Sequence, residues 1–360
     1  MVNIRGMVVL EHNIFIAWQH ACTYNLKAKQ KVMSLSHVAP ALPPGTKPLA
    51  NQVAGHKYGE GKSKLGCLQH IDGTILKPVQ YPPKGQREVD FYQTVFNNEN
   101  TEEILQQLRC HVPQFFGIFE SAENPKIKYL KLENLMYKFS QPCVLDIKMG
   151  KVTYDPEAPP EKIALELAKF PPAINLGYQF SGMQVFNPEQ KKIVKYDKYY
   201  CKKLTEDTII KQGFGKFFMI DSNFKRSLIK VVIRKLKSMK DWFLKQRKYA
   251  FYASSILMVY DGDKKQEEDC EMDYKSYDGI QDNVGHIADN ERTVNGTANS
   301  ENERTNVSAK MDEEIIVDEN IEVKMIDFTH VFHSSEEDQN YLFGLENLIH
   351  HLEILLQDGS

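Results

Sequence analysis

The feature that most constrains this chain is a short apolar run, Pro142–Gly150, which contains two opposite charges. In an extended strand, alternate side chains face the same side. Asp146 and Lys148 then share one face, while Leu145 and Ile147 point into a core. The sequence therefore predicts a buried strand that brings a carboxylate and an ammonium into one small site.

Length and composition are those of a large globular protein. The 360 residues, 42% of them hydrophobic, suffice for one large domain or two lobes. The six cysteines are scattered without CxxC pairs, so we expect reduced thiols, with the protein in the nucleus and cytoplasm, and no zinc site. The apolar runs near the N-terminus are too short for a membrane span, and we find no signal sequence.

The formal net charge of −3 hides an uneven distribution. Residues 261–320 contain 18 acidic and 6 basic side chains and few apolar ones. Such a segment cannot bury enough surface to offset its ordering entropy, so we predict a disordered acidic insertion. The remaining residues have a basic surplus of nine, which suits an anionic ligand such as a phosphate ester, although ordinary solvated surfaces often show a similar surplus.

The first half of the chain divides into a leader and a small lobe. Residues 1–50 lack steady periodicity and end in a proline-rich stretch, which is typical of a flexible leader. Residues 51–140 begin with two apolar segments around Asp72-Gly73, a dipeptide favoured in two-residue hairpin turns. Lys77 lies on the second strand, and Glu88 lies in the first turn of the helix that follows. With a second helix and further strands, this segment is predicted to be an N-lobe.

The second half is predicted to be a larger lobe interrupted by the acidic insertion. Residues 141–260 form its first part, and residues 321–360 continue it with a strand that ends at Asp327 and a final helix. Prolines bracket a short helix near 160–170. Lys162 and Lys169 are expected on one face of this helix. That face could bind phosphates, or it could simply be exposed to solvent. A longer basic amphipathic helix, residues 223–249, could attach to membranes or to calmodulin, but such a helix is more often the surface helix of a core.

Five charged residues could together serve the transfer of a γ-phosphoryl group, which needs charge neutralisation, a metal ligand and an aligned hydroxyl. Lys77 could hold nucleotide phosphates while Glu88 positions its ammonium. Asp327 follows an apolar strand, as a metal-binding acid would, since Mg²⁺ prefers carboxylates and phosphate oxygens. Asp146 and Lys148 complete the set. The sequence contains neither a GxxxxGK[ST] loop nor a His-Arg-Asp loop, which argues against a P-loop enzyme and an ordinary protein kinase.

Together these motifs resemble the inositol polyphosphate kinase family, whose signature is the PxxxDxKxG pattern found at Pro142–Gly150. The match runs from about Asn51 to Leu356, apart from the acidic segment. Other matching motifs are Gln52–His56, Asp72-Gly73 with Lys77, Arg87–Tyr92, Leu132–Leu135, Ser254–Tyr260 and Ile326–Phe328. Within the family the chain is most similar to the multikinase branch, which His330 after the Ile-Asp-Phe triplet favours.

The resemblance implies a two-lobed α+β fold, related to protein kinases and ATP-grasp proteins, with antiparallel sheets and a short helical substrate-binding insertion. It also implies an ATP site between the lobes. Lys77 would contact the ATP phosphates, and the backbone at Glu133 and Leu135 would contact adenine. Asp146 would hydrogen-bond the ribose, and Asp327 would ligate Mg²⁺.

On the acceptor side, the resemblance implies that Lys148 stabilises the transferring phosphoryl group and orients the substrate hydroxyl. The implied substrate contacts are Lys84, Lys148, Lys162, Lys169, Lys198 and His330. Three residues depart from the multikinase pattern. Ala164 and Leu165 replace polar glutamine-type residues, and Gln184 replaces an arginine. An arginine can bind a phosphate through two parallel hydrogen bonds, which a glutamine cannot match. The preferred inositol phosphate is therefore left open.

The resulting functional hypothesis is an ATP- and Mg²⁺-dependent kinase, a monomer, that phosphorylates soluble inositol trisphosphates and tetrakisphosphates. Phosphatidylinositol 4,5-bisphosphate at a membrane surface is a further substrate if the site is open enough, and no nucleic acid partner is predicted. The enzyme alternatives are inositol trisphosphate 3-kinase and inositol hexakisphosphate kinase, against which the absence of a large added substrate domain argues mildly. A noncatalytic nuclear adaptor is an alternative of another class, but retention of all the charged motif residues speaks against it.

Overall fold

In this computed structural model, the described residues are 39–61, 64–218, 225–263 and 321–358. The chain divides into one unit of residues 1–263 and 320–360 and another of residues 264–319, and only residues of the first are described. The predicted acidic insertion, apart from residues 261–263, and most of the predicted leader therefore lie outside the described residues. Among the described residues, no helix has the length and apolar character needed to cross a bilayer.

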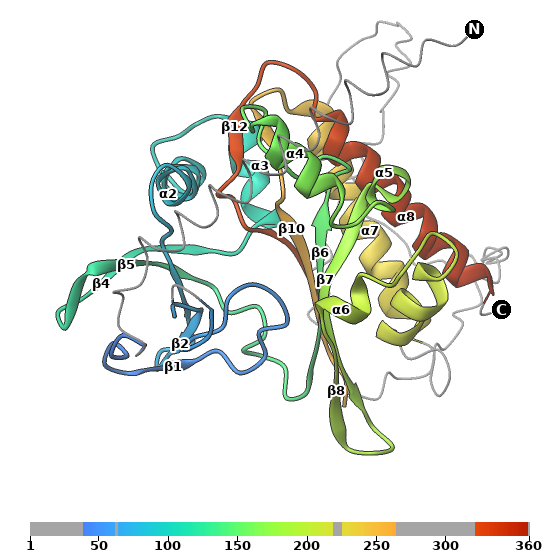
Figure 1. Cartoon of the computed structure of the whole chain (residues 1–360), viewed down its shortest axis with the longest axis horizontal. Helices are drawn as coiled ribbons and strands as arrows, with labels where there is room; N and C mark the ends of the chain where they lie inside the picture. Colours follow the sequence, from blue (N-terminus) through green and yellow to red (C-terminus); the bar gives the residue numbers. More distant parts are fainter. Residues whose placement is uncertain (1–38, 62–63, 219–224, 264–320, 359–360) are drawn as a thin grey trace, which may run out of the picture. The chain divides into compact units, whose positions relative to one another are not determined.

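The first sheet has five antiparallel strands in the order β1-β2-β3-β5-β4 (Figure 1). The strands are β1 (Thr46–Pro48), β2 (Leu68–His70), β3 (Ile75–Pro78), β4 (Phe115–Ser121) and β5 (Asn124–Leu132). β1 pairs with β2, so the ordered chain begins before the predicted boundary at residue 51. The N-lobe and C-lobe boundaries otherwise stay predictions.

The predicted hairpin is confirmed, but its turn differs from the expected one. β2 and β3 pair up to Gln69 and Ile75, which leaves more than two residues in the loop. Gly73 has a positive φ of 88°, whereas Asp72 does not take the left-handed conformation. Instead the Asp72 carboxylate accepts a hydrogen bond from the Thr74 backbone N–H at 3.0 Å, as in an Asx turn.

Two helices follow the hairpin, α2 (Lys84–Val95) and α3 (Glu103–Leu108), and a 3₁₀ turn (Arg109–His111) extends the second. The apolar spacing predicted α2, which buries Phe91, Tyr92 and Val95. The prediction that Glu88 lies in the first turn of this helix is wrong. Because α2 begins at Lys84, Glu88 lies in its second turn.

The second sheet has the order β11-β10-β6-β7-β8, again antiparallel. Its strands are β6 (Pro142–Met149), β7 (Tyr178–Asn187), β8 (Lys192–Tyr196), β10 (Ser255–Asp261) and β11 (Ile321–Ile326). β6 is the predicted signature strand, and its Leu145 and Ile147 are completely buried as predicted. A register shift against β7 falls between Asp146 and Ile147, beside the two charged positions.

Two long helices, α7 (Arg226–Lys245) and α8 (Gln339–Asp358), pack against each other, and α7 also contacts β11. Shorter elements are α4 (Pro160–Leu167), α5 (Ala173–Leu176), α6 (Lys198–Cys201), a π-helical segment (Ile209–Gly215), and the paired strands β9 (Tyr249–Phe251) and β12 (Val331–His333). The apolar stripe of α7 is buried, which fits the prediction of a surface helix on a core. The predicted α+β class with antiparallel sheets is confirmed.

Candidate active site

The centre of the site is an ion-pair cluster formed by residues far apart in the sequence. Lys77 Nζ on β3 lies 2.6 Å from Glu88 Oε1 on α2 and 2.5 Å from Asp327 Oδ1 after β11. The same Glu88 oxygen accepts a hydrogen bond from the Phe328 backbone N–H at 2.9 Å. Asp327 has a φ of 66°, a left-handed conformation that turns the chain where β11 ends.

The charges in this cluster support one another. Desolvation disfavours the charged form of Lys77, but the carboxylates of Asp327 and Glu88 outweigh it and raise the pKa of Lys77 well above its usual value. Desolvation likewise opposes ionisation of Asp327, yet Lys77, followed by Lys148 and His330, lowers the pKa of that carboxyl. Glu88 is completely buried, whereas the Asp327 side chain is 46% exposed, so Asp327 can still meet a ligand.

The signature strand adds Asp146 and Lys148 to this cluster. Asp146 is buried, and its burial and the nearby charge of Asp327 raise its pKa to about 6, against hydrogen bonds from Ser255 and Ser181. Lys148 lies close enough to Asp146 and Asp327 for its charge to lower the pKa of both. Asp146 Oδ1 is buried and has no hydrogen-bond partner among the described residues. Such an orphaned acceptor suits a hydroxyl donor from a ligand.

The two residues predicted at the adenine site lie just after β5. The Glu133 backbone N–H donates to the Gln114 carbonyl at 2.9 Å, which leaves the Glu133 carbonyl as the group it can offer to a ligand. No hydrogen bond within the described part of the chain uses the Leu135 backbone N–H. The Leu135 side chain is packed with Met136 and Val144. One acceptor and one donor are thus available beside an apolar wall.

A second cationic cluster contains three of the predicted substrate residues. His330 Nδ1 is hydrogen-bonded to Asp155 Oδ1, and Lys162 Nζ lies 3.9 Å from the other Asp155 oxygen. Desolvation lowers the pKa of His330, Asp155 opposes that shift, and the charges of Lys84 and Lys162 add to it. Lys84, Lys162 and His330 are therefore neighbours. Sequence reasoning did not identify Asp155 as a site residue. Its position, just before Pro156 in the loop that follows the signature strand, could have indicated one.

Two other predicted substrate residues have contacts of their own. The prediction that Lys169 shares a helical face with Lys162 is wrong, because α4 ends at Leu167 and Lys169 Nζ pairs with Glu166 at 2.6 Å. Lys198 begins α6, and its Nζ lies 5.2 Å from the centroid of the Tyr199 ring. Within the described ranges, no hydrogen bond or ion pair links either lysine to His330.

Gln184, where the multikinase pattern has an arginine, lies inside the second sheet. Its side chain is completely buried in β7, and its amide donates to the Pro142 carbonyl at 2.8 Å. The Gln184 side chain has no exposed surface in the structure, and its role in substrate preference stays a prediction. Ala164 and Leu165, in contrast, are exposed on α4.

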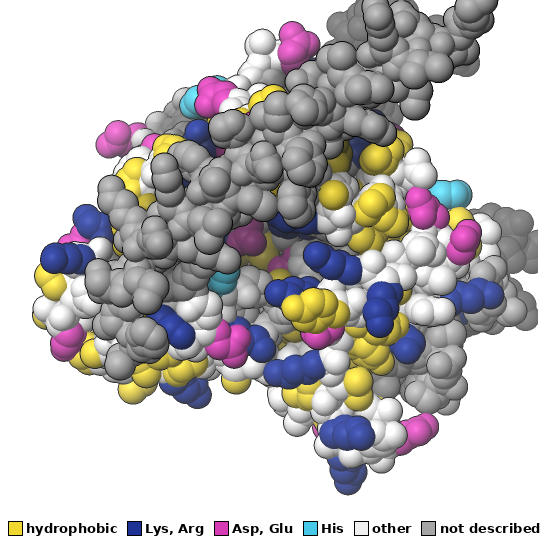
Figure 2. All heavy atoms as spheres, in the orientation of Figure 1, with side chains coloured by type: hydrophobic (Ala, Val, Ile, Leu, Met, Phe, Trp, Pro, Cys, Tyr) yellow, Lys and Arg dark blue, Asp and Glu magenta, His cyan; other side chains and the backbone are white. Residues whose placement is uncertain are grey.

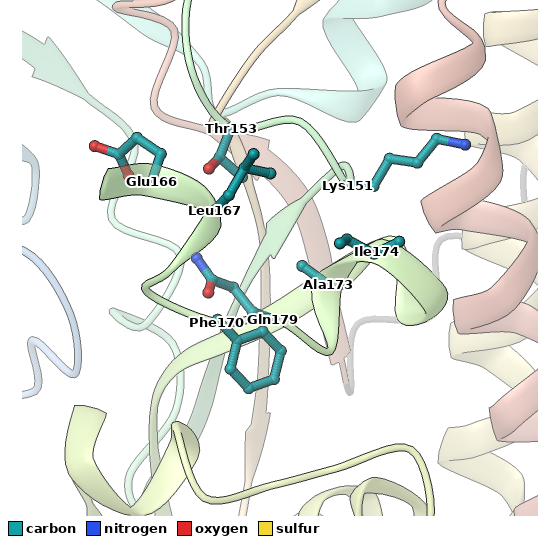
Figure 3. A pocket seen from close by; sticks show the side chains of 8 residues that line it. All are labelled: Lys151, Thr153, Glu166, Leu167, Phe170, Ala173, Ile174 and Gln179. Carbon is teal, nitrogen blue, oxygen red and sulfur yellow. The ribbon is translucent and has the colours of Figure 1, made fainter. Parts of the chain in front are cut away.

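A small pocket lies between α4, α5 and the start of β7, away from the charged centre (Figure 3). Its lining residues are Lys151, Thr153, Glu166, Leu167, Phe170, Ala173, Ile174 and Gln179. Figure 3 shows the Lys151 side chain pointing away from the others, and its Nζ lies 4.4 Å from the centroid of the Phe343 ring. The pocket contains neither the Lys77 cluster nor Lys148, so we do not assign the chemistry to it.

Metal binding at the charged centre would need ligands from outside the protein. Across the described residues, no group of three His, Cys, Asp or Glu side chains could hold a metal ion. Asp327 is the half-exposed carboxylate of the cluster, and Mg²⁺ is commonly bound by one or two carboxylates together with substrate phosphates and water. The residues present therefore fit a metal that arrives with a nucleotide.

The fold and the site define a class of protein. A strand lysine paired with a helix glutamate, an acid at a strand end and a separate cationic cluster form the apparatus of a phosphotransferase for anionic acceptors. The family model for inositol polyphosphate kinase matches residues 129–353. The chain belongs to the inositol polyphosphate kinase family, as its signature predicts, and is an enzyme of that kind.

Individual relatives agree with this assignment. The inositol polyphosphate multikinase of Rattus norvegicus is 30% identical over 88% of this chain and 94% of its own length. Inositol hexakisphosphate kinase 1 of Homo sapiens is 28% identical over 85% of this chain and 71% of its own. The inositol phosphate multikinase of S. cerevisiae, solved with ADP and Mn²⁺, superposes with a TM-score of 0.53 at 21% identity, covering 79% of this chain and 99% of that one.

Proposed function

We propose that this chain is an inositol polyphosphate multikinase that transfers the γ-phosphate of ATP to hydroxyls of inositol trisphosphates and tetrakisphosphates. The observation that carries the proposal is the convergence of Lys77, Asp146, Lys148 and Asp327 on one centre, with the His330 cluster nearby. The match to the rat multikinase over 94% of that protein's length supports this branch of the family.

The nucleotide would be held by groups that have free capacity. Lys77 neutralises phosphate charge, and buried Glu88 fixes its ammonium at 2.6 Å. The unpartnered Oδ1 of Asp146 accepts a ribose hydroxyl. The Glu133 carbonyl and the Leu135 N–H offer an acceptor and a donor to the adenine edge.

The divalent ion would be held by Asp327 and the nucleotide phosphates. We propose Mg²⁺, by analogy with the Mn²⁺ in the S. cerevisiae protein, and such an ion supplies charge neutralisation to the phosphates. The ion pair with Lys77 keeps Asp327 ionised and oriented toward that position.

On the acceptor side, Lys148 stabilises the negative charge of the transferring phosphoryl group. Lys84 and Lys162 attract the phosphates of the inositol ring, and Asp155 acts as a positioning residue that holds Nδ1 of His330. With Nδ1–H donated to Asp155, Nε2 of a neutral His330 is left to accept a hydrogen bond from a substrate hydroxyl.

The test is transfer from labelled ATP to a panel of inositol phosphates. Lys148→Ala should lower kcat by at least ~10²-fold, because the transition-state charge loses its partner. Lys151→Ala is the matched control, since Lys151 is exposed and its ammonium lies over Phe343. Equal activity of the wild type and Lys148→Ala would refute the role of Lys148, and absence of transfer by the wild type would favour an adaptor.

The same panel separates the branches of the family. We expect inositol trisphosphate and tetrakisphosphate to be better acceptors than inositol hexakisphosphate. Preference for the hexakisphosphate would assign the chain to the hexakisphosphate kinases, which are also similar to it. Phosphatidylinositol 4,5-bisphosphate belongs in the panel as a further proposed acceptor, presented as a short-chain lipid so that access to a bilayer does not limit the reaction.

A further inference from the structure

The segments at the β8 edge of the second sheet carry a dense group of lysines. These eight, here called the lysine face, are all exposed and surround the β8 edge, with Lys192 and Lys195 on opposite sides of the sheet because they are three positions apart on one strand: Lys191, Lys192, Lys195, Lys198, Lys202, Lys203, Lys211 and Lys216. None of them forms an ion pair with a carboxylate in the part of the chain that the structure describes. The lysine face therefore has positive charge available for an external partner.

Residues 191–216 contain eight lysines and three acidic residues, Asp197, Glu206 and Asp207, and two of these acids are hydrogen-bonded within the protein. Asp197 caps α6 by accepting hydrogen bonds from two backbone N–H groups, at 3.0 and 2.9 Å. Glu206 accepts a hydrogen bond from the Asn175 amide at 3.0 Å. Tyrosines lie among the lysines instead, with Lys216 Nζ 5.3 Å from the centroid of the Tyr196 ring and Tyr199 65% exposed. Tyrosine is enriched where apolar and aqueous phases meet.

An exposed apolar patch adjoins the lysine face. Leu165 and Leu167 on α4 are 65% and 40% exposed, and Ile174 on α5 is 56% exposed. The hydrogen bond between Asn175 and Glu206 places α5 next to the loop that follows α6. Figure 2 shows hydrophobic side chains gathered around the position of α5, with Lys and Arg side chains spread below them over α6 and β8.

We propose that the lysine face and the apolar patch of Leu165, Leu167 and Ile174 dock this protein onto an anionic phospholipid bilayer. Lysines attract anionic headgroups, and exposed aliphatic side chains enter the boundary between headgroups and acyl chains. A nucleic acid would be attracted by the same lysines but would not require exposed leucine and isoleucine beside them. The docking concerns bulk anionic lipid and so goes beyond the proposed kinase reaction.

The test measures cosedimentation of the full-length protein with vesicles of phosphatidylcholine alone or mixed with phosphatidylserine. We expect binding only to the anionic vesicles, weakening as salt is added. Lys191→Ala/Lys192→Ala/Lys195→Ala should weaken binding on the order of 10²-fold, since each lysine at an anionic surface contributes about a fivefold factor. The matched control, Lys47→Ala/Lys57→Ala/Lys126→Ala, removes three exposed lysines from outside the lysine face and should change binding only slightly.

The apolar patch is tested separately. Leu165→Ser/Ile174→Ser should lower vesicle binding by about tenfold or more, because each aliphatic side chain gains transfer free energy in the bilayer interface. Circular dichroism of each variant checks that it is folded. Equal weakening by the two triple-lysine variants, no effect of the apolar variant, or binding of single-stranded RNA without binding of vesicles would overturn the proposal. The readout is independent of kinase activity.

Discussion

At the scale of single residues, the site holds carboxylates in contrasting environments. Glu88 is completely buried, but Lys77 and the Phe328 N–H satisfy one of its oxygens. Asp327 shares Lys77 yet remains half exposed. Asp146 is buried beside Asp327, and one of its oxygens is unpartnered. Their different environments suit them to different tasks: Glu88 to fix the lysine, Asp327 to meet a cation, and Asp146 to accept a hydroxyl.

Asp146 should make stability depend on pH. Its pKa rises from 3.8 to about 6 on folding, so the folded state binds more protons than the unfolded chain between about pH 4 and 6. Stability from this group is therefore lost as the pH rises through that window. The unfolding free energy of Asp146→Asn minus that of the wild type should therefore increase by on the order of 2–3 kcal/mol as the pH rises from about 4 to 7. Urea unfolding at a series of pH values measures this difference. The exposed control Asp207→Asn should show no such trend, and a pH-independent difference for Asp146→Asn would contradict the assignment.

Lys77 and Glu88 should be strongly coupled in stability. Lys77→Met leaves the completely buried Glu88 carboxylate without a counter-charge, which should cost on the order of 3–5 kcal/mol of unfolding free energy. Adding Glu88→Gln removes that charge while keeping an acceptor for the Phe328 N–H, so the double variant should regain much of the loss. Additive effects in the urea-unfolding cycle would show that the pair is not coupled.

At the scale of elements, the nucleotide side of the site depends on a close approach to β7. Gly182 on β7 lies opposite Asp146 on β6. A Cβ at Gly182 would lie 2.1 Å from the Val53 carbonyl oxygen, so only glycine allows this segment to lie on the sheet. Val53 in turn packs against the apolar cluster that contains Leu135 and Val144. The wall beside the proposed adenine site is thus held by a contact between two segments.

Gly182→Ala should therefore weaken nucleotide binding. The added methyl must displace the Val53 backbone, and overpacking of this kind typically costs 1–3 kcal/mol. We expect ADP affinity, measured by calorimetry with Mg²⁺ present, to fall about tenfold or more. Gly117→Ala is a comparison for backbone strain without a steric clash, because φ there is 104° and a Cβ would meet no atom within 4 Å, so it should leave ADP affinity largely unchanged. Unchanged ADP affinity in Gly182→Ala would exclude this role for the close approach.

At the scale of the whole molecule, the second sheet closes across the long interruption in the sequence. Tyr260 on β10 is paired directly with Ile321 on β11, so the strand ends lie side by side. A short hairpin loop could join them. Replacing residues 264–319 by a short Gly-Ser loop should leave kinase activity unchanged and unfolding free energy no lower, with a gain of at most about 2 kcal/mol from the shorter loop. Loss of activity in a folded variant would show that the segment takes part in catalysis.

Much of this architecture could be predicted from local patterns. The alternation around Asp146 and Lys148 predicted β6, the apolar spacing of residues 89–96 predicted α2, and prolines marked the start of α4. Predictions that needed exact element ends were less accurate. Glu88 was placed one turn too early, and Lys169 was placed on a helix that stops before it, because capping and tertiary packing decide where a helix ends.

The sequence by itself determined which residues carry charge into an apolar core, since side-chain period and burial follow from the order of residues along one strand or helix. Only the tertiary structure decided which of those charges meet. Lys77 and Asp327 are 250 positions apart, and Asp155 reaches His330 from 175 positions away. Such contacts depend on how two sheets and their helices pack, and local pattern contains no information about that packing.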